Sequence, residues 1–402
     1  MPPASPSTAR AMNDRLALKL LQERGPLSAS QLTTLTGLAR PTVADLIQRL
    51  AAAGLIAPAG ESEARRRGPN ARLYGIVADR AHLAALDMRT DGVRVRVADL
   101  LGTQLAEAQL LVDPAAPPEE AVRGTAELLD HAAAEAGVER LHSVAVGVPG
   151  LIDPRTARLR TATGLDWHRE LIALLQDRLS AAVRTENESN LAALAELRAG
   201  AARDRDSFVF FWLGEGPGAA VILDGALRSG ASGGAGEIGF LPVPGAEALP
   251  SAATCESGFH SLVCDAAVRQ LAAEHGMDPA LGAEQALRAA VEGGGRGEGV
   301  GSGEGPGPEA AFLDALATRI MLGAAAVTAV LDPGCLVLGG ALGHAGGAPL
   351  AARVERQLAE VTPLRTEVRA SSYGDDGVLN GALLAAVDMA QEAVFPSFPS
   401  AG

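Results

Sequence analysis

The stretch LSASQLTTLTGLARPTVADLIQRLAAAGLI, residues 27–56, decides the architecture of the N-terminal part of the chain. Ser28 or Ser30 can cap a short helix that ends at Gly37. Pro41 suits the first position of a second helix, whose apolar residues repeat at helical spacing. A helix, a glycine turn and a second helix with a polar face predict a helix-turn-helix.

The segments on either side complete a winged helix. Before the motif, NDRLALKLLQERG (residues 13–25) spaces Leu16, Leu20 and Leu21 at helical intervals and stops at a Gly-Pro pair. After it, residues 54–77 read as two short strands around a polar loop. The loop carries three arginines, Arg65, Arg66 and Arg67.

This arrangement predicts binding to double-stranded operator DNA, because the second helix of such a motif lies in the major groove. The candidate DNA-binding residues are Arg40, Thr42, Val43, Gln48 and Arg49 on that helix, together with the three loop arginines. Residues 1–80 carry 11 Lys and Arg against 6 Asp and Glu, whereas the remainder carries 23 against 42. A basic head on an acidic body favours a polyanionic partner for the head. Taken singly, helical pairs are common in any bundle, and an arginine run is usually a solvated loop.

Length and composition fit a globular protein. A chain of 402 residues favours two or three domains, and 48% hydrophobic with 20% charged residues is typical of a folded core. We find neither a signal peptide nor about 18 uninterrupted apolar residues, so we expect a cytoplasmic protein without membrane association. Cys255, Cys264 and Cys335 are too few for a disulfide framework.

From Leu83 the pattern changes to an α/β body. In LAALDMRTDGVRVRVADLLG (residues 83–102) valines alternate with arginines after a turn, which predicts a hairpin with a half-buried second strand. SFVFFWLGEGPGAAVILDGAL (residues 207–227) repeats the plan, so the sequence predicts an internally duplicated body with a cleft between two lobes. We expect a disordered N-terminus (1–11), a winged helix-turn-helix (12–78), a first lobe (79–200), a second lobe (201–392) with a mobile Gly-rich insertion (293–308), and a flexible C-terminus (393–402).

Five stretches follow one another along the chain: residues 28–56 of the head, VGVPGLID (146–153), TENESNLAALAELRAGAA (185–202), GEGPGAAVILDGALRSGASGGAGEIGF (214–240) and DPGCLVLGGAL (332–342). In this order they resemble the ROK family of repressors, open reading frames and kinases. The resemblance implies an N-terminal winged helix-turn-helix followed by a two-lobed actin-like ATPase body, similar to sugar kinases.

The resemblance also implies where this chain departs from a kinase. Glu188 stands where family kinases have a catalytic Asp, and its extra methylene displaces the carboxylate. The phosphate turn D-x-G-G-T reads DMRTDG (residues 87–92), so side chains such as Arg89 replace bare backbone. In the second phosphate loop Glu215 adds an anion and Pro217 removes an N–H donor. We therefore expect a body without phosphoryl transfer, with no catalytic residue and no cofactor.

The family's zinc and sugar residues are only partly present. Phe240 replaces a His ligand, and Cys255, His260 and Cys264 are too few for a structural zinc, so we expect no metal. The resemblance implies that Asn187, Glu188 and Glu237 line the ligand cleft. An alternative for Asn187 and Glu188 is that they cap the N-terminus of a helix.

The preferred interpretation is a DNA-binding transcriptional regulator, a repressor of carbohydrate uptake or metabolism genes whose inactive kinase-like body senses a sugar or related molecule. A homodimer or a dimer of dimers would present two recognition helices to a palindromic operator. Two alternatives stay open: an active ATP-dependent sugar kinase with a vestigial head, and a DNA-binding regulator that uses no ligand.

Overall fold

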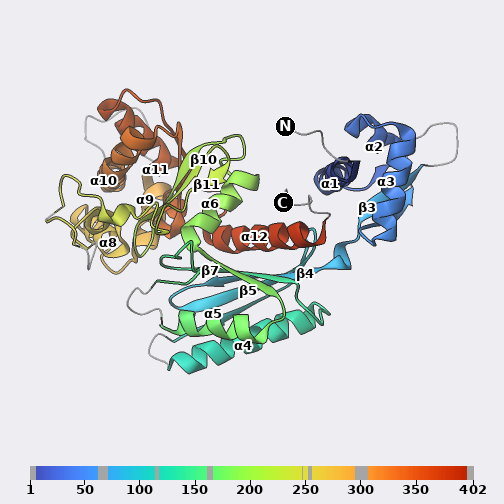
Figure 1. Cartoon of the computed structure of the whole chain (residues 1–402). Coiled ribbons are helices and arrows are strands. Elements are labelled where there is room, and N and C mark those ends of the chain that lie inside the picture. The colour runs from blue at the N-terminus through green and yellow to red at the C-terminus, as the bar shows by residue number, and fades with distance from the viewer. Residues whose placement is uncertain are drawn as a thin grey trace. The chain divides into compact units, whose positions relative to one another are not determined.

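The computed structural model of the chain describes residues 6–61, 71–113, 117–160, 166–246, 248–251, 256–294 and 307–395. Contacts divide the chain into two compact units (Figure 1). Unit 1 contains residues 1–146, 167–184 and 383–402, and unit 2 contains residues 147–166 and 185–382. The expected division at residue 200 therefore differs from the observed one, because residues 185–200 pack in unit 2 and the chain returns to unit 1 near its C-terminus.

The N-terminal head has the expected winged helix-turn-helix fold. Its elements are α1 (Pro6–Arg24), β1 (Leu27–Ser28), α2 (Ala29–Thr36), α3 (Arg40–Ala52), β2 (Ile56–Glu61) and β3 (Arg72–Ile76). The three strands form an antiparallel sheet in the order β1-β3-β2. Helix α1 begins at Pro6, so residues 6–11, which we expected to be disordered, are helical. Its buried side chains include Leu18 and Leu21, whereas Leu16 is exposed.

The first body sheet has five strands in the order β6-β5-β4-β7-β8. Its strands and helices are β4 (His82–Met88), β5 (Gly92–Asp99), β6 (Gln104–Leu111), α4 (Pro118–Glu135), β7 (Ser143–Val148), α5 (Asp166–Arg178) and β8 (Ala182–Asn187), after a short helix at Ala78–Arg80. Strands β4, β5 and β6 are antiparallel. Helices α4 and α5 lie together on one face of this sheet (Figure 1).

The second body sheet repeats this plan in the order β11-β10-β9-β12-β13. Its strands are β9 (Phe208–Trp212), β10 (Gly218–Leu223), β11 (Ala226–Leu227), β12 (Cys335–Gly339) and β13 (Glu367–Ala370). Its helices are α6 (Glu188–Ala199), α7 (His260–Val263), α8 (Asp265–Glu274), α9 (Ala283–Gly294), α10 (Pro308–Leu331) and α11 (Gly340–Val361), with short 3₁₀ turns at Ile238–Phe240 and Gly374–Asp376. Helix α12 (Gly377–Val394) begins in unit 2 and passes into unit 1 at residue 383. The hairpin β9–β10 is antiparallel, and β12 is parallel to β9 and β13. The shared order confirms the predicted duplication.

Strand β9 is buried on both faces. Val209 and Phe211 join a core formed with α8 to α11, whereas Phe208 and Phe210 join a core formed with α6. Side chains alternate across a strand, so a continuous apolar run is what a sheet covered on both faces requires.

Strand β5 is more deeply buried than its alternating pattern predicts. Arg96 is buried, and Arg94 is half-buried, although the alternation had placed both on a solvent face. Each guanidinium lies 2.8 Å from a carboxylate oxygen of Glu107 on β6. Desolvation works to raise the pKa of Glu107, but the hydrogen bonds from Arg94 and Arg96 outweigh it and lower the pKa. The ion pairs with Glu107 compensate the charges of Arg94 and Arg96, which explains why this face of the strand can bury arginines.

Helix α10 is long and apolar enough to cross a membrane by length and composition alone, with a hydropathy of 1.6 over its most apolar window. In the structure Phe312, Leu316 and Ile320 of this helix belong to the core of unit 2. Core packing therefore accounts for the apolar composition of its inner face.

The expected mobile insertion, residues 293–308, is described only at its ends. Helix α9 ends at Gly294 and α10 begins at Pro308, while residues 295–306 lie outside the described residues. The expected flexible C-terminus begins inside helix α12, which continues to Val394.

Candidate DNA-binding surface and ligand site

Ser28 holds the start of the helix-turn-helix. Its hydroxyl accepts a hydrogen bond from the backbone N–H of Gln31, and its own backbone N–H donates to Gln31 Oε1 at 2.8 Å. This reciprocal capping box satisfies two backbone donors that a helix start leaves unpaired. Of the two possible caps in the sequence, the structure selects Ser28. Gly37 ends α2 in the left-handed conformation, with φ of 70°.

The exposed face of α3 carries three of the predicted base-contacting residues. Arg40 and Gln48 are exposed, and Thr42 is half-exposed. None of the three side chains makes a hydrogen bond or ion pair with another described residue, so their donors and acceptors face solvent. Val43 is different, because it is 1% exposed and packs in the core of the head. The prediction that Val43 contacts a base is wrong for this conformation.

Arg49 connects two helices of the head. Its guanidinium donates to both carboxylate oxygens of Asp14 on α1, with Nη2 to Oδ1 at 2.6 Å and Nε to Oδ2 at 3.4 Å. It also pairs with Asp45 one turn earlier on α3. Because these contacts occupy the guanidinium, we correct its predicted role from DNA contact to a brace between α1 and α3.

The wing has the two predicted strands, β2 and β3. Residues 62–70 between them lie outside the described residues, and with them the three candidate arginines, Arg65, Arg66 and Arg67. Their contact with DNA stays a prediction.

The N-terminus of α6 places two of the predicted ligand residues in unit 2. Asn187 is the N-cap: its Oδ1 accepts from the backbone N–H of Ser189 at 2.9 Å and of Asn190 at 3.3 Å. Its Nδ2 donates to the carbonyl oxygen of Gly150 at 3.0 Å. The alternative reading as a helix cap therefore holds for Asn187, which keeps one N–H to offer a ligand. Glu188 is the first residue of the helix and is half-buried.

Three further contacts join this helix start to Glu237. A Cβ at Gly218, the first residue of β10, would lie 3.1 Å from Ser189 Oγ. The next residue, Ala219, donates its N–H to the carbonyl oxygen of Gly236 at 2.8 Å. A Cβ at Gly236 or Gly233 would overlap a backbone carbonyl oxygen, and both residues have positive φ, so only glycine fits this loop.

A side chain at Gly233 would meet the carbonyl oxygen of Ile152. Ile152 lies two residues after Gly150, which accepts the hydrogen bond from Asn187. These contacts connect four segments of unit 2 with one another: residues 150–152, the start of α6, the start of β10 and the loop 230–237. Glu237 follows that loop with its side chain accessible, and desolvation by the surrounding protein raises the pKa of its carboxyl. The structure therefore brings Asn187, Glu188 and Glu237 into one neighbourhood of unit 2.

The turn after β4 is closed by an ion pair. Asp87 is 1% exposed, and its Oδ2 lies 3.0 Å from Nε of Arg89. The carbonyl oxygen of Arg89 is in turn bonded to Nε2 of the buried His168 at 3.2 Å. Desolvation lowers the pKa of His168 to about 4, so the ring is neutral at pH 7 and Nε2 carries the donated proton. The half-exposed guanidinium of Arg89 thus donates a hydrogen bond to the buried carboxylate of Asp87.

The described residues contain no group of three or more side chains suited to a metal ion. His260 and Cys264 form a pair: their hydrogen bond raises the pKa of the imidazole and lowers the pKa of the thiol. Cys255 lies outside the described residues, so the expectation of no metal stays a prediction.

Sequence reasoning missed the two contacts that hold these sites in shape. Asp14 is 35 positions from Arg49, and no local pattern links them. The pair Asp87 and Arg89 had a signal, because residues two apart on an extended chain share a face.

Comparison with known proteins agrees with this architecture. The sequence model described as the ROK family matches residues 83–389, and one described as a winged helix-turn-helix DNA-binding domain matches residues 13–57. The xylose repressor of Caldicellulosiruptor bescii is 24% identical over 237 residues, which is 58% of this chain and 59% of the repressor. The chain thus spans about three fifths of the length of this curated relative.

Two solved structures share the fold. A ROK family transcriptional regulator, a homologue of the Escherichia coli Mlc protein, has a TM-score of 0.72 at 19% identity, covering 96% of this chain and 98% of that chain. A ROK family glucokinase from Streptomyces griseus, solved with glucose and AMPPNP, has a TM-score of 0.61 at 22% identity. It covers 77% of this chain and 100% of that chain. With one family model matching most of the chain and a second matching its head, the chain belongs to the ROK family and carries a winged helix-turn-helix ahead of the family's body.

Proposed function

We propose that this protein is a transcriptional repressor that binds operator DNA through its head and responds to a sugar or sugar derivative bound in its body. The observation that carries the proposal is the winged helix-turn-helix, described apart from residues 62–70, in front of a ROK body. The relative from Caldicellulosiruptor bescii, named a xylose repressor, supports the same class. Binding to chromosomal DNA would make the protein cytoplasmic.

We assign the reading of DNA bases to the polar side chains of α3 that have no partner among the described residues of the head. Arg40 suits the edge of a guanine and Gln48 the edge of an adenine, since both side chains can form paired hydrogen bonds with those bases. Thr42 is near enough to the helix start to reach a base or a phosphate.

We assign the wing arginines to phosphate contacts. Replacing Arg65, Arg66 and Arg67 together with Ala should therefore weaken binding to every DNA sequence and flatten its salt dependence. A salt dependence equal to that of the original protein would remove the wing from the interface.

The body is proposed to bind a ligand without phosphorylating it. Arg89 occupies the carboxylate of Asp87, which family resemblance would assign to magnesium, and Glu215 brings an anion to the second phosphate loop. The structural likeness to a glucokinase favours the rival function, an active kinase. An ADP-release assay over hexoses and pentoses, with a ROK glucokinase as positive control, distinguishes the two. Turnover that disappears in the Glu188→Ala variant would establish the kinase and end this part of the proposal.

The ligand would be read by Glu237 and Glu188, with one N–H from Asn187. Carboxylates accept hydrogen bonds from hydroxyl groups in pairs, which is how polar side chains orient a sugar. A ligand changes operator affinity only by the ratio of its affinities for the DNA-competent and the released state. We propose that a two-fold homodimer carries this change to two recognition helices, which sedimentation of the free protein would test.

The proposal is tested by affinity selection of fragmented genomic DNA on the purified protein at about 0.15 M salt, where non-specific binding is weakened. We expect discrete palindromic sites next to genes of carbohydrate uptake or metabolism. A panel of sugars and sugar phosphates is then added to the isolated complex, and the effective compound should release the DNA. Retention of all fragments alike would contradict the proposal. Discrete sites that no sugar releases would favour the alternative of a regulator without a ligand.

A further inference from the structure

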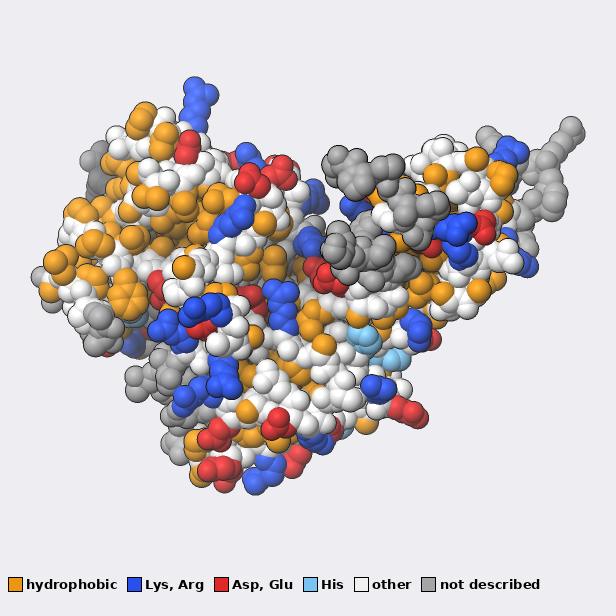
Figure 2. Space-filling model, viewed as in Figure 1, with side chains coloured by type: hydrophobic (Ala, Val, Ile, Leu, Met, Phe, Trp, Pro, Cys, Tyr) orange, Lys and Arg blue, Asp and Glu red, His pale blue; other side chains and the backbone are white. Residues whose placement is uncertain are grey.

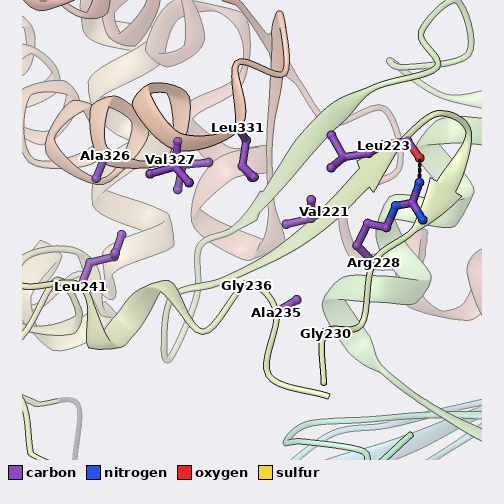
Figure 3. Close-up of a pocket in the computed structure, with 11 residues that line it drawn as sticks. Val221, Leu223, Arg228, Gly230, Ala235, Gly236, Leu241, Ala326, Val327 and Leu331 are labelled. Atoms are coloured by element: carbon purple, nitrogen blue, oxygen red, sulfur yellow. Dashed lines mark hydrogen bonds between the residues drawn. The ribbon is translucent and has the colours of Figure 1, made fainter. Parts of the chain in front are cut away.

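A hollow of about 370 Å³ lies between strand β10 and helix α10 in unit 2 (Figure 3). Val221 on the strand and Val327 and Leu331 on the helix face one another across it, and Leu241 closes one end. None of these residues belongs to the set assigned above to DNA or to a sugar. The hollow is large enough for a small molecule with an aromatic ring, since ligand pockets begin at about 300 Å³.

Small residues create this space. Gly230, Ala235 and Gly236 form the wall opposite the helix, and Ala326 is the shortest side chain on the helix wall. Strand β11 spans only Ala226–Leu227, so it covers only the end of β10. The hollow is open to solvent at its rim, where Val330 lies exposed. Small side chains on its walls thus leave room that a bound molecule can fill.

The surface around the hollow is apolar as well. Hydrophobic side chains gather over α10 and its neighbours in unit 2 (Figure 2). Val330, which lines the rim, is 81% exposed. Contiguous exposed apolar surface is uncommon on soluble proteins and often marks a binding site.

Among the described residues that line the hollow, Arg228 alone is charged. Its Nη2 donates to the carbonyl oxygen of Leu223 at 3.1 Å and reaches the exposed carboxylate of Asp224 at 3.5 Å (Figure 3). An exposed pair at that distance is weak. The described hydrogen bonds of Arg228 leave Nε and Nη1 available at the rim. The arginine therefore offers donors and a positive charge beside an apolar chamber.

From this juxtaposition we propose that the hollow binds a small amphipathic anion, an aromatic or short aliphatic group that carries a carboxylate or a sulfonate. The apolar group fills the chamber between β10 and α10, and the anionic group lies on the guanidinium of Arg228. One charge at one end of a chamber of this size fits a single small molecule. The hollow shares the loop 230–237 with the proposed sugar site but is lined by none of Asn187, Glu188 and Glu237, and the proposal does not depend on DNA binding.

A pair of fluorescent probes tests the proposal on the full-length protein. 8-Anilino-1-naphthalenesulfonate carries the anion, and N-phenyl-1-naphthylamine has the same aromatic framework without it. We expect saturable binding of both at one site per chain. Ala326→Phe fills the chamber and should weaken both probes at least tenfold. Arg228→Gln should weaken the sulfonate about fivefold and leave the uncharged probe unchanged, and benzoate should displace the sulfonate.

Two matched variants control for position. Arg288→Gln changes an arginine whose side chain is 49% exposed, as that of Arg228 is, and which also pairs with a carboxylate four residues away. Ala329→Phe adds the same ring to an exposed position of α10 outside the hollow. Both should bind the probes as the original protein does, and circular dichroism should show that all four variants fold.

Several results would overturn the proposal. Equal binding of the sulfonate by the Ala326→Phe variant would place the probe elsewhere, and equal loss of both probes in Arg228→Gln would remove the anion site. If sulfonate binding appears only on dilution, together with dissociation of an oligomer in sedimentation, a second copy of the chain is the occupant instead.

Discussion

Helix α3 of the head and the turn after β4 in the body use polar residues in opposite ways. On α3, the side chains of Arg40 and Gln48 are exposed and make no hydrogen bond or ion pair with another described residue. In the turn, Asp87 is paired with Arg89, and His168 holds the backbone of Arg89. Polar groups left to solvent are available to a partner, whereas polar groups that satisfy one another stabilise the fold. The difference agrees with the proposal that the head binds DNA and that the body binds a ligand without phosphorylating it.

The strongest test of the closed turn removes its cation. In Arg89→Met the buried carboxylate of Asp87 loses the N–H donor of Arg89, so we expect unit 1 to lose about 3 kcal/mol of unfolding free energy, the upper end of the cost of depriving a buried polar group of a partner. Urea unfolding followed by circular dichroism measures this. Adding Asp87→Asn should restore part of the loss. An unchanged midpoint would mean that the pair does not stabilise the turn.

The same turn should respond to acid through His168. Its folded pKa of about 4 lies below the ordinary value of 6.5, so the unfolded chain binds the proton more readily between those values. Stability should therefore be present above pH 6.5 and fall as the pH drops towards 4, by up to about 3 kcal/mol. Comparing thermal melts of the original protein and His168→Gln across this range measures the effect. His131→Gln, at an exposed position of α4, should retain the whole pH dependence.

Arg49 differs from Arg40 on the same helix, because its guanidinium already pairs with Asp14 and Asp45. Replacing it with Met should cost the head about 2 kcal/mol, with Lys restoring only part, since a lysine lacks the fork that meets both oxygens of Asp14. Differential scanning calorimetry gives the size of the change. A variant that melts normally but prefers other DNA sequences would return Arg49 to the DNA-binding residues.

Gln48 should behave in the reverse manner. Gln48→Ala should leave the melting temperature unchanged and cost about 1 kcal/mol of preference for the operator over other DNA, the low end for one base contact. Competition binding with operator and mutated sites measures this. Gln22→Ala on the exposed face of α1 is the matched control. Equal weakening on every sequence would reassign Gln48 to phosphate.

Local sequence patterns predicted the helices and strands better than they predicted the tertiary contacts that these elements make. The turn signals and alternation around Val93, Val95 and Val97 predicted the first hairpin, because strand formation depends on near neighbours. The burial of Arg96 depends on Glu107 on the next strand, which alternation within one strand does not reveal. The capping box of Ser28 and Gln31 was readable from its spacing and would have excluded Ser30.

The candidate site was predicted as a neighbourhood and missed in its details. Family resemblance brought Asn187 and Glu237 together, and the structure joins their segments through β10. The use of Asn187 as a helix cap was an alternative that spacing alone left open. The burial of Val43 follows from its place on the apolar face of α3, where it is three residues before Leu46.

The passage of the chain between the two units has a mechanical consequence. The chain passes from unit 1 into unit 2 and back again twice, at residues 147–166 and 185–382, and unit 1 holds both ends of the chain. A pulling force applied to the two ends therefore acts on unit 1 first, and unit 2 bears load only after its host has opened. In a single-molecule stretching experiment the extension from unit 2 should come last, even where unit 2 is the less stable of the two.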